Sequence, residues 1–381
     1  MRIGIMLRSL DERGGIGVYT RCLTEELLAI DRRNHYVLFY RNPANLGRFA
    51  QFPNVTERVV RGRSKAVWDQ WAIPLACWRE RIDVLFHPKF TLPLLAPCPA
   101  VIALHGADWF LPEQAQFYKP WDVLYVKVMM PLYLWKASRA VSVSQMTTDD
   151  FNRVLRLPPG KIQTIYIAAA KHMRPISDPA VLEAVKRRYD LPQRFILTLS
   201  GYDRGRRKNI DRLIAAYRLV HGRTPHELVI GGRDCEKFRL DYAIPEQGYG
   251  AAIRFPGWID QQDLPAVYSL ADLFLFPSRV ESFGIPLVEA MVCGTPIVAS
   301  DMQGLREIAG DAAVAVDADD PRAIAEAVLR VLGDPALRES LRARGFERAR
   351  STFSYKKCAR ETLAVLEEVG KRGHSSFSPA Q

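Results

Sequence analysis

The feature that most constrains the fold is an alternation of short apolar runs with amphipathic helical stretches. In the first half of the chain the runs are rich in Val, Ile, Leu and aromatic residues, and they occupy 2–7, 36–40, 83–86, 100–104 and 140–143. Helical stretches such as 16–30 and 121–137 separate several of these runs. Strands that alternate with helices predict an α/β domain with a parallel, doubly wound sheet.

The alternation begins again in the second half of the chain. A strand is expected at 195–199 and a helix at 208–221, and further strands are expected at 227–230, 253–255, 271–276, 295–299 and 312–316. Three helical stretches follow, at 321–332, 335–349 and 353–369. A chain of 381 residues is also too long for one ordinary core. We therefore expect two Rossmann-like, doubly wound domains that face each other across a cleft.

The boundary between these domains is expected within 166–194, where prolines interrupt the periodicity. We place the first domain at 1–172 and the second at 173–352. The polar segment 371–381 is expected to be a disordered tail.

Composition narrows the class of protein. Hydrophobic residues make up 48% of the chain and charged residues 25%, as in a soluble globular protein. The six cysteines form no C-x-x-C pair, so we expect reduced thiols in the cytoplasm and no zinc site or disulfide framework. The first apolar run ends at Arg8 and is interpreted as a strand, not a signal peptide. No uncharged apolar run of 18 residues is present, so no membrane span is expected.

Positive charge is concentrated in the first half of the chain. The net charge is +11, and residues 1–170 hold 22 Lys and Arg against 14 Asp and Glu. This excess is compatible with an acidic partner, such as phosphates or anionic lipid, or with an ordinary soluble surface rich in arginine. Nucleic acid is not expected as a partner, because no basic run is interleaved with aromatic residues.

A pair of carboxylates surrounds a glycine turn in the second half. Glu281 and Glu289 follow the strand-like run 271–276, with the turn and a helix start between them. In open α/β sheets ligands bind where strands end. The backbone N–H groups of Ser282–Gly284 are expected to face an anion there, and both carboxylates accept hydrogen bonds from hydroxyl groups. An anion beside several hydroxyl groups describes a sugar nucleotide.

The loop at 201–209 carries four cations in five positions, between a predicted strand and a predicted helix. Arg204, Arg207 and Lys208 belong to this group. Arginine binds phosphate with two parallel hydrogen bonds and lysine adds a point charge, so the loop suits a diphosphate. The alternative is a solvated basic loop without a ligand.

Two features of the first half point to the same kind of site. The glycines Gly14, Gly15 and Gly17 follow the first strand and open a helix, which allows a phosphate or sugar to approach the backbone. Thr20 stands where a dinucleotide fingerprint has its third glycine, so a nicotinamide enzyme is disfavoured. His105 ends the strand at 100–104 and is expected to contact a ligand. The alternatives are a plain tight turn and a structural histidine.

Two other stretches have plainer explanations beside a functional one. Asp317-Ala-Asp319 has the spacing of a metal-binding D-x-D motif, but it precedes Asp320-Pro321 and a helix, so we interpret it as a cap and expect no metal. The apolar, aromatic segment 121–135 is either a core helix or a helix that rests on a membrane surface beside Lys127, Lys136 and Arg139.

These elements resemble, in their order along the chain, the retaining nucleotide-sugar glycosyltransferases of family 4. The resemblance covers nearly the whole chain and is strongest from about 195 to 350. Its most specific parts are Phe276-Pro-Ser278 leading into Glu281 and Glu289, the run 294–300, Arg207-Lys208-Asn209, and the turn 255–258. The resemblance implies the GT-B fold, in which two Rossmann-like domains are joined by a last helix, here about 353–370, that crosses back onto the first domain.

The resemblance also implies roles for individual residues. Glu281 would lie against the donor sugar and Glu289 would accept hydrogen bonds from the ribose. Lys208, with Arg207, would neutralise the leaving diphosphate. His105 matches a histidine near the donor sugar. The candidate catalytic residues are thus His105, Arg207, Lys208 and Glu281, and the candidate donor-binding residues are Gly14, Gly15, Arg204, Ser282, Phe283, Gly284, Ile285 and Glu289.

At two positions the chain departs from the family pattern. Tyr202 stands where many members have an arginine, and Gly106 stands where an aspartate often follows the histidine, with Asp108 two residues further on. Details of sugar contact therefore do not follow from the resemblance.

The expected function is retaining transfer of a sugar from a GDP- or UDP-sugar to a glycan or lipid-linked saccharide, in surface polysaccharide or glycolipid assembly. The nucleotide-sugar is a co-substrate and no other cofactor is expected. The protein is expected in the cytoplasm. Two locations are open there: free in solution, or at the inner face of the cell membrane in peripheral contact with anionic lipid. A nucleotide-sugar epimerase and a catalytically idle nucleotide-sugar-binding protein are the alternatives.

Overall fold

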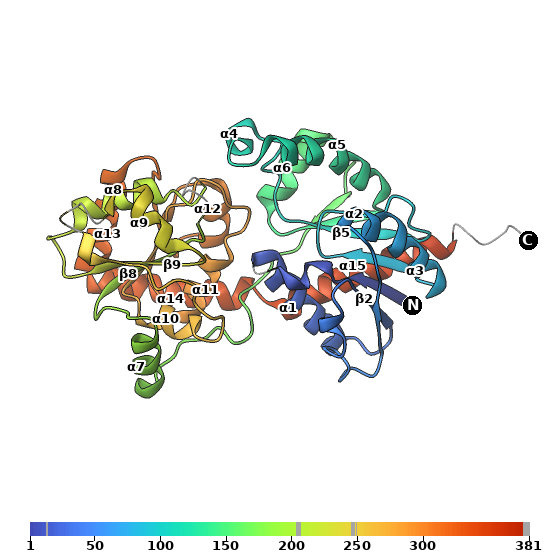
Figure 1. The fold of residues 1–381 in the computed structure, drawn as a ribbon, viewed down its shortest axis with the longest axis horizontal. Helices are drawn as coiled ribbons and strands as arrows, with labels where there is room; N and C mark the ends of the chain where they lie inside the picture. Colours follow the sequence, from blue (N-terminus) through green and yellow to red (C-terminus); the bar gives the residue numbers. More distant parts are fainter. Residues whose placement is uncertain (13, 203–206, 245–247, 249, 376–381) are drawn as a thin grey trace, which may run out of the picture. The chain divides into compact units, whose positions relative to one another are not determined.

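The computed structural model describes residues 1–12, 14–202, 207–244, 248 and 250–375 of the chain. The chain forms two compact units (Figure 1). Unit 1 comprises Met1–Ile167 together with Ser354–Gln381, and unit 2 comprises Ala168–Phe353. Each unit is built around one parallel sheet.

The sheet of unit 1 has seven strands in the order β3-β2-β1-β4-β5-β6-β7. All pairs are parallel, and Ile3 of β1 lies opposite Tyr36 on one side and Val84 on the other. The central strands are apolar on both faces because helices cover both faces of such a sheet. The strands are β1 (Arg2–Met6), β2 (His35–Tyr40), β3 (Val55–Val59), β4 (Val84–His87), β5 (Ala100–Leu104), β6 (Arg139–Ser142) and β7 (Ile162–Thr164).

The helices of unit 1 include one from the far end of the chain. α15 packs against α1 and contacts β4, β5 and β6, so the last helix belongs to unit 1. The helices are α1 (Gly15–Ile30), α2 (Lys65–Val67), α3 (Ile73–Arg79), α4 (Pro112–Ala115), α5 (Pro120–Lys136), α6 (Gln145–Leu155) and α15 (Tyr355–Ser375), with the short 3-10 helices η1 (Arg8–Asp11) and η2 (Pro43–Asn45). The segment η3 (Trp68–Ala72) is π-helical and joins α2 to α3.

The sheet of unit 2 has six parallel strands in the order β10-β9-β8-β11-β12-β13. Its strands are β8 (Phe195–Leu199), β9 (Glu227–Gly231), β10 (Ile253–Arg254), β11 (Leu273–Phe276), β12 (Ile297–Ser300) and β13 (Val314–Val316). Its helices are α7 (Pro179–Arg188), α8 (Ile210–Val220), α9 (Phe238–Asp241), α10 (Leu264–Leu270), α11 (Ile285–Cys293), α12 (Gln303–Ala309), α13 (Pro321–Gly333) and α14 (Pro335–Thr352), with the turns η4 (Cys235–Lys237) and η6 (Gly250–Ala252).

Several helices of unit 2 begin at an Asp-Pro pair. The side chain of Asp320 accepts a hydrogen bond of 2.8 Å from the backbone of Arg322, and Asp334 accepts one of 2.9 Å from Leu337. An aspartate at the N-cap satisfies a backbone donor, and the proline after it has the backbone angle of a first helical residue. These pairs fix the start of α13 and of α14.

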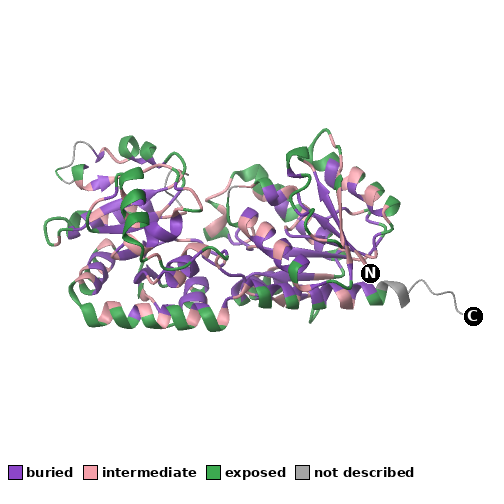
Figure 2. Cartoon of the chain, turned by 90° about the horizontal axis from the view of Figure 1, so that it is seen from below, coloured by how far each residue is buried: buried purple, intermediate pink, exposed green. Residues whose placement is uncertain are grey.

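The inner strands of both sheets are largely buried, and most exposed residues lie on the outward sides of helices and in loops (Figure 2). In each sheet the chain order reverses at one point, between β1 and β4 in unit 1 and between β8 and β11 in unit 2. Loops on both sides of such a point leave in opposite directions and form a crevice at the carboxyl ends of the strands. This is where a ligand site is expected in each unit.

The structure differs from the sequence-based expectations in three places. β3 and β7 had not been expected as strands. α15 continues to Ser375, five residues into the segment 371–381 that was expected to be disordered, whereas 376–381 lie outside the described residues. The first unit ends at Ile167, five residues before the boundary that we placed after 172. Among the described residues, no helix combines the length and the apolar character that crossing a membrane requires.

Candidate functional site

An ion pair between Lys208 and Glu281 lies at the switch point of unit 2. Lys208 stands between β8 and α8, and Glu281 stands between β11 and α11, so the strand order brings together residues that are far apart in sequence. The ammonium group of Lys208 donates a hydrogen bond to Oε1 of Glu281. It also lies 4.8 Å from the centre of the Phe276 ring, at the end of β11.

The pair is largely removed from water. The side chain of Lys208 is 16% exposed and that of Glu281 is 10% exposed. Burial by itself raises the pKa of the Glu281 carboxyl, but the charges of Lys208 and Arg207 and the hydrogen bond from Lys208 outweigh it, so its pKa lies below the ordinary value. Glu281 is therefore a carboxylate at neutral pH, held beside two cations.

Asn209 fastens the cationic loop to the end of β11. Its backbone has φ +60°, and its side-chain amide donates to the carbonyl oxygens of Pro277, at 3.0 Å, and Ala318, at 2.7 Å. The backbone N–H of Arg279 donates to the carbonyl of Arg207 at 3.0 Å. These bonds hold Arg207 and Lys208 against the β11 loop. Arg204 lies outside the described residues.

The turn between Glu281 and α11 depends on one glycine. Gly284 is the N-cap of α11 with φ +81°, and a Cβ atom there would approach Leu305 Cδ2 to 2.9 Å. Ile285 is the first helical residue, and the ring of Phe283 packs edge-on against Phe353 with centroids 5.6 Å apart. Ser282–Ile285 thus form a tight turn that leads into the first turn of a helix, where backbone N–H groups have no acceptor within the helix.

Glu289 lies on α11, buried in unit 2. Its Oε2 accepts a hydrogen bond of 3.1 Å from the hydroxyl of Tyr268. Burial raises the pKa of Glu289 to about 7, and the bond from Tyr268 opposes this only in part. The carboxyl group therefore changes its charge near neutral pH.

His105 follows β5 in unit 1. Its Nε2 donates to the carbonyl of Pro88 at 2.9 Å, and its ring packs edge-on against Tyr19 of α1, with centroids 5.0 Å apart. Burial lowers the pKa of His105 to about 4 despite the bond to Pro88. The ring is neutral at pH 7, and because Nε2 carries the proton, Nδ1 is an acceptor.

The glycine loop of unit 1 leads directly into α1. Gly14 is the N-cap of α1 and Gly15 its first residue. A Cβ atom at Gly17 would lie 1.8 Å from the carbonyl oxygen of Glu12, whereas one at Gly14 would meet nothing within 4 Å. Gly17 is therefore required for the turn itself, and Gly14 leaves open space beside the helix start.

Tyr202, and Asp108 near the second departure at Gly106, both have partners within the protein. The hydroxyl of Tyr202 donates to Asp241 at 2.7 Å, and its ring lies 5.2 Å from that of Phe238. Asp108 is buried and accepts a hydrogen bond of 2.6 Å from Tyr118. Both residues contribute to the packing of their own unit.

The aspartates at and beside the D-x-D spacing form an ion pair, a backbone hydrogen bond and a helix cap within the protein. Asp319 forms an ion pair of 2.9 Å with Arg279, and Asp317 accepts a hydrogen bond of 2.9 Å from the backbone of Asp319. Asp320 caps α13. In the part of the chain that the structure describes, no three His, Cys, Asp or Glu side chains are grouped as metal ligands.

Within unit 2 the structure brings together Arg207, Lys208 and Glu281, and it places Ser282–Ile285 and Glu289 on the turn and helix that follow. In unit 1 it places His105 against α1, which Gly14 and Gly15 begin. Sequence reasoning had not identified Tyr268 as the partner of Glu289, and no local pattern around Tyr268 indicates it. Asn209 had been noted only as part of a motif, and its left-handed backbone explains why asparagine stands there.

Comparison with known proteins agrees with this arrangement. The sequence pattern described as Glycosyltransferase Family 4 matches residues 13–169, and that described as Glycosyl transferases group 1 matches residues 184–348. The chain is 32% identical over 300 residues to O-antigen chain mannosyltransferase B of Escherichia coli, covering 77% of this chain and 75% of the relative. The chain is a family 4 glycosyltransferase. This glycosyltransferase is also 23% identical over 295 residues to alpha-D-kanosaminyltransferase of Streptomyces kanamyceticus, covering 75% of this chain and 74% of the relative.

Solved structures establish the fold of this glycosyltransferase. Sucrose-phosphate synthase from Thermosynechococcus elongatus matches with a TM-score of 0.75 at 22% identity, over 98% of this chain and 100% of that chain. Anabaena HepE, solved in complex with UDP-glucose, matches with a TM-score of 0.75 at 18% identity, over 97% of this chain and 100% of that chain. The expected family and the GT-B fold are thus confirmed.

Proposed function

We propose that this glycosyltransferase moves a mannosyl residue from a nucleotide-diphosphate sugar to a saccharide acceptor, with retention of the anomeric configuration, in the assembly of a surface polysaccharide. The observation that carries the proposal is the buried Lys208–Glu281 pair at the switch point of unit 2. The similarity to the O-antigen mannosyltransferase supports the choice of sugar and of pathway. The donor carries GDP or UDP.

Departure of the nucleotide is the step for which unit 2 is suited. As the bond to the sugar breaks, negative charge grows on the diphosphate while the sugar becomes oxocarbenium-like. Lys208 and Arg207 would neutralise the diphosphate, and the N–H groups of Ser282–Ile285 would bind its oxygens. Groups already fixed in place stabilise such charge without reorganisation, which is the largest contribution a protein makes to this kind of reaction. We propose that the protein needs no metal for this step.

The carboxylates then hold the donor. Glu281, ionised beside Lys208, would accept hydrogen bonds from the sugar hydroxyls, and Glu289 would accept them from the ribose. For unit 1 we propose that neutral His105 contacts the donor sugar and that Gly14 and Gly15 lie against the substrates. In a retaining reaction the acceptor attacks the face that the diphosphate leaves, so Glu281 orients the donor and forms no covalent adduct.

Turnover assays distinguish this function from its alternatives. GDP-mannose, UDP-glucose and their nucleotides are added to the purified chain, and the thermal midpoint and the released nucleotide are measured. A bound donor stabilises the folded state by mass action. At a donor concentration 100 times its Kd, the free energy of unfolding rises by about 2.7 kcal/mol. With saccharide acceptors present we expect nucleotide release and a retained anomeric linkage by NMR. Release of an altered sugar nucleotide without acceptor identifies an epimerase, and donor binding without turnover over a broad acceptor panel identifies an idle binding protein.

We also propose that unit 1 contacts an anionic membrane surface. One face of α5 packs in the core of the unit through Val126, Met130, Tyr133 and Leu134. The opposite face carries an exposed apolar stripe at helical spacing, formed by Trp121, Leu124, Tyr125, Val128, Leu132 and Trp135. Trp121 is 80% exposed and Trp135 is 81% exposed. Exposed tryptophans along one face are typical of a helix that lies in a lipid interface.

A second exposed apolar stripe lies on η3 and α3. Segment 92–96 connects this region to α5. Trp71, Leu75 and Trp78 are exposed at helical spacing on η3 and α3. Segment 92–96 bonds to both elements: Gln70 of η3 donates to the carbonyl of residue 92, and Lys136 of α5 donates to that of residue 96. The exposed cations of 61–81 are Arg61, Arg63, Lys65, Arg79 and Arg81. These positive charges would attract the negative headgroups at the inner face of the cell membrane.

Liposome sedimentation tests this contact. The protein is expected to sediment with vesicles of phosphatidylcholine and phosphatidylglycerol, and much less with pure phosphatidylcholine or in moderate salt, because salt screens the attraction. The variant Trp121→Gln/Trp135→Gln should lose most of this binding. Leu240→Gln is the matched control, since Leu240 is 83% exposed in unit 2. Equal sedimentation of wild type and double variant, or self-association through these tryptophans in place of vesicle binding, would contradict the proposal.

A further inference from the structure

A cavity of about 490 Å³ opens in unit 1, lined by residues to which the proposed transfer mechanism gives no part. Its basic residues come after three neighbouring strands: Arg8 follows β1, Arg41 follows β2, and Lys65 lies beyond β3. Asp11 and Glu12 also line it. The cavity therefore lies at the carboxyl ends of the strands, beside the switch point of this sheet.

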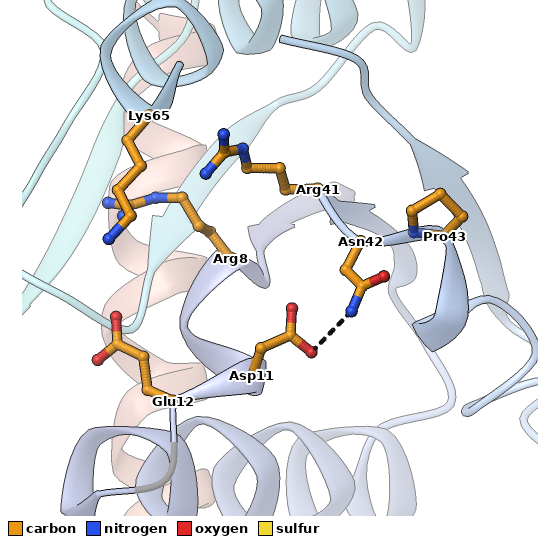
Figure 3. A pocket seen from close by; sticks show the side chains of 7 residues that line it. All are labelled: Arg8, Asp11, Glu12, Arg41, Asn42, Pro43 and Lys65. Atoms are coloured by element: carbon orange, nitrogen blue, oxygen red, sulfur yellow. Dashed lines mark hydrogen bonds between the residues drawn. The ribbon is translucent and has the colours of Figure 1, made fainter. Parts of the chain in front are cut away.

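The nitrogen ends of Arg8, Arg41 and Lys65 gather on one side of this pocket, while the carboxyl groups of Asp11 and Glu12 belong to the other side (Figure 3). Like charges repel, so three cations around one space create a positive potential that favours an anion. Which of them can act on a ligand depends on their own protein partners.

One cation and one carboxylate are already neutralised by the protein. Arg8 forms two parallel hydrogen bonds of 3.1 Å to the carboxylate of Asp69, and its side chain is 8% exposed. Lys89 forms an ion pair of 2.6 Å with Glu12. Both pairs keep their residues fixed at the wall of the pocket.

Two cations have no such partner. Neither Arg41 nor Lys65 forms an ion pair or a side-chain hydrogen bond with another residue in the described ranges. Asp11 accepts hydrogen bonds from Asn45, at 2.8 Å, and Asn42, at 3.3 Å, which orient its carboxylate without neutralising it. The pocket thus offers two available positive charges opposite one carboxylate.

This arrangement fits a ligand with an anionic group at one end and hydroxyl groups at the other. A phosphate monoester carries between one and two negative charges at pH 7, and its oxygens suit the fork of Arg41 and the point charge of Lys65. The carboxylate of Asp11 accepts hydrogen bonds from hydroxyl groups. A phosphorylated sugar combines both ends.

We propose that this pocket binds the acceptor through a phosphate on its saccharide, with Arg41 and Lys65 contacting the phosphate and Asp11 contacting sugar hydroxyls. The inference rests on the proposed function, since it names the chemical class of the acceptor for the same transfer reaction. It requires the phosphate and the sugar to be recognised together.

Calorimetric titration of the full chain with mannose 6-phosphate, mannose and inorganic phosphate tests the pocket. We expect mannose 6-phosphate to bind at least tenfold more tightly than either mannose or inorganic phosphate. In Arg41→Gln/Lys65→Gln this affinity should fall at least tenfold. The matched control is Arg63→Gln, an exposed arginine of the same segment that does not line the pocket. Its affinity should stay within twofold of wild type. Thermal midpoints of all variants should agree, because the replaced cations hold no protein partner.

Three results overturn the pocket assignment: equal affinity for mannose 6-phosphate and mannose, equal affinity for mannose 6-phosphate and inorganic phosphate, or undiminished affinity in the double variant. Donor turnover is measured on the same preparations. Tight mannose 6-phosphate binding that the double variant loses, in a protein that turns over no donor, supports the pocket and removes the proposed function. Donor turnover together with unchanged binding in the double variant removes the pocket alone.

Discussion

Replacing Lys208 by Met is expected to lower kcat at least 100-fold while donor binding weakens much less. In the proposed mechanism Lys208, with Arg207, neutralises the diphosphate as it leaves, and both cations lie beside the Glu281 carboxylate. Interactions that strengthen in the transition state act on kcat, and loss of one preorganised donor costs about 100- to 1,000-fold. The measurement is steady-state transfer from GDP-mannose or UDP-glucose, whichever donor the turnover panel selects, compared with calorimetric Kd values for the same donor.

The same substitution also destabilises the protein, so activity and folding must be separated. Met at 208 leaves the Glu281 carboxylate buried without its partner, and breaking one side of a buried pair costs about 3–5 kcal/mol. The double variant Lys208→Met/Glu281→Gln removes both charges and should recover most of the thermal midpoint, yet remain inactive. Arg188→Met is the control: the half-exposed Arg188 forms ion pairs of 2.8 Å with both Asp260 and Asp263, and its loss should leave activity unchanged and cost less stability than Lys208→Met. Full turnover in Lys208→Met or in the double variant would sink the proposed role.

Much of the fold follows from local sequence, because the central strands of a parallel sheet are buried on both faces. Their sequences are continuous apolar runs, such as 100–104, and these are recognisable without any partner. β3 and β7 were missed because they are edge strands. Their sequences, Val-Thr-Glu-Arg-Val and Ile-Gln-Thr, carry polar residues where one side meets water, so the pattern is that of a loop.

The candidate site was visible from sequence only in its separate parts. Glu281 follows a strand and Lys208 precedes a helix, and both facts are local. Their ion pair joins residues 73 positions apart and depends on β8 lying beside β11, which is a property of strand order. The neutral state of His105 has the same origin, since it depends on burial in the folded unit, whereas the bond to the carbonyl of Pro88, 17 positions away, determines that Nε2 carries the proton. Arg41 and Lys65 belong to no local motif, so their meeting at one pocket is seen only in three dimensions.

Donor affinity is expected to rise roughly 20-fold between pH 5.5 and pH 7.5, because of Glu289. The ribose hydroxyls would donate to its carboxylate, and burial raises the pKa of this group to about 7 in the free protein. Below pH 7 the proton must leave before the donor binds, so affinity falls by up to about tenfold for each further pH unit. Calorimetry should use an intact nucleotide-sugar, because the terminal phosphate of a free nucleotide diphosphate titrates in the same range.

Glu289→Gln should bind the donor more weakly at pH 8 and lose this pH dependence.

The stability of the ligand-free protein should change with pH in the opposite direction from donor affinity: the Glu289 contribution should fall as pH rises. Because the folded pKa of Glu289 lies above the ordinary value of 4.5, its contribution to stability is fully present below pH 4.5 and is lost as pH rises through 7. Near pH 8 the variant should therefore be more stable than wild type by up to about 3 kcal/mol. The lowered pKa of His105, about 4, destabilises the protein as pH falls below 6.5. This effect is the same in wild type and in Glu289→Gln, so it cancels when the two are compared. Parallel pH profiles of donor affinity in wild type and Glu289→Gln would show that another group controls binding.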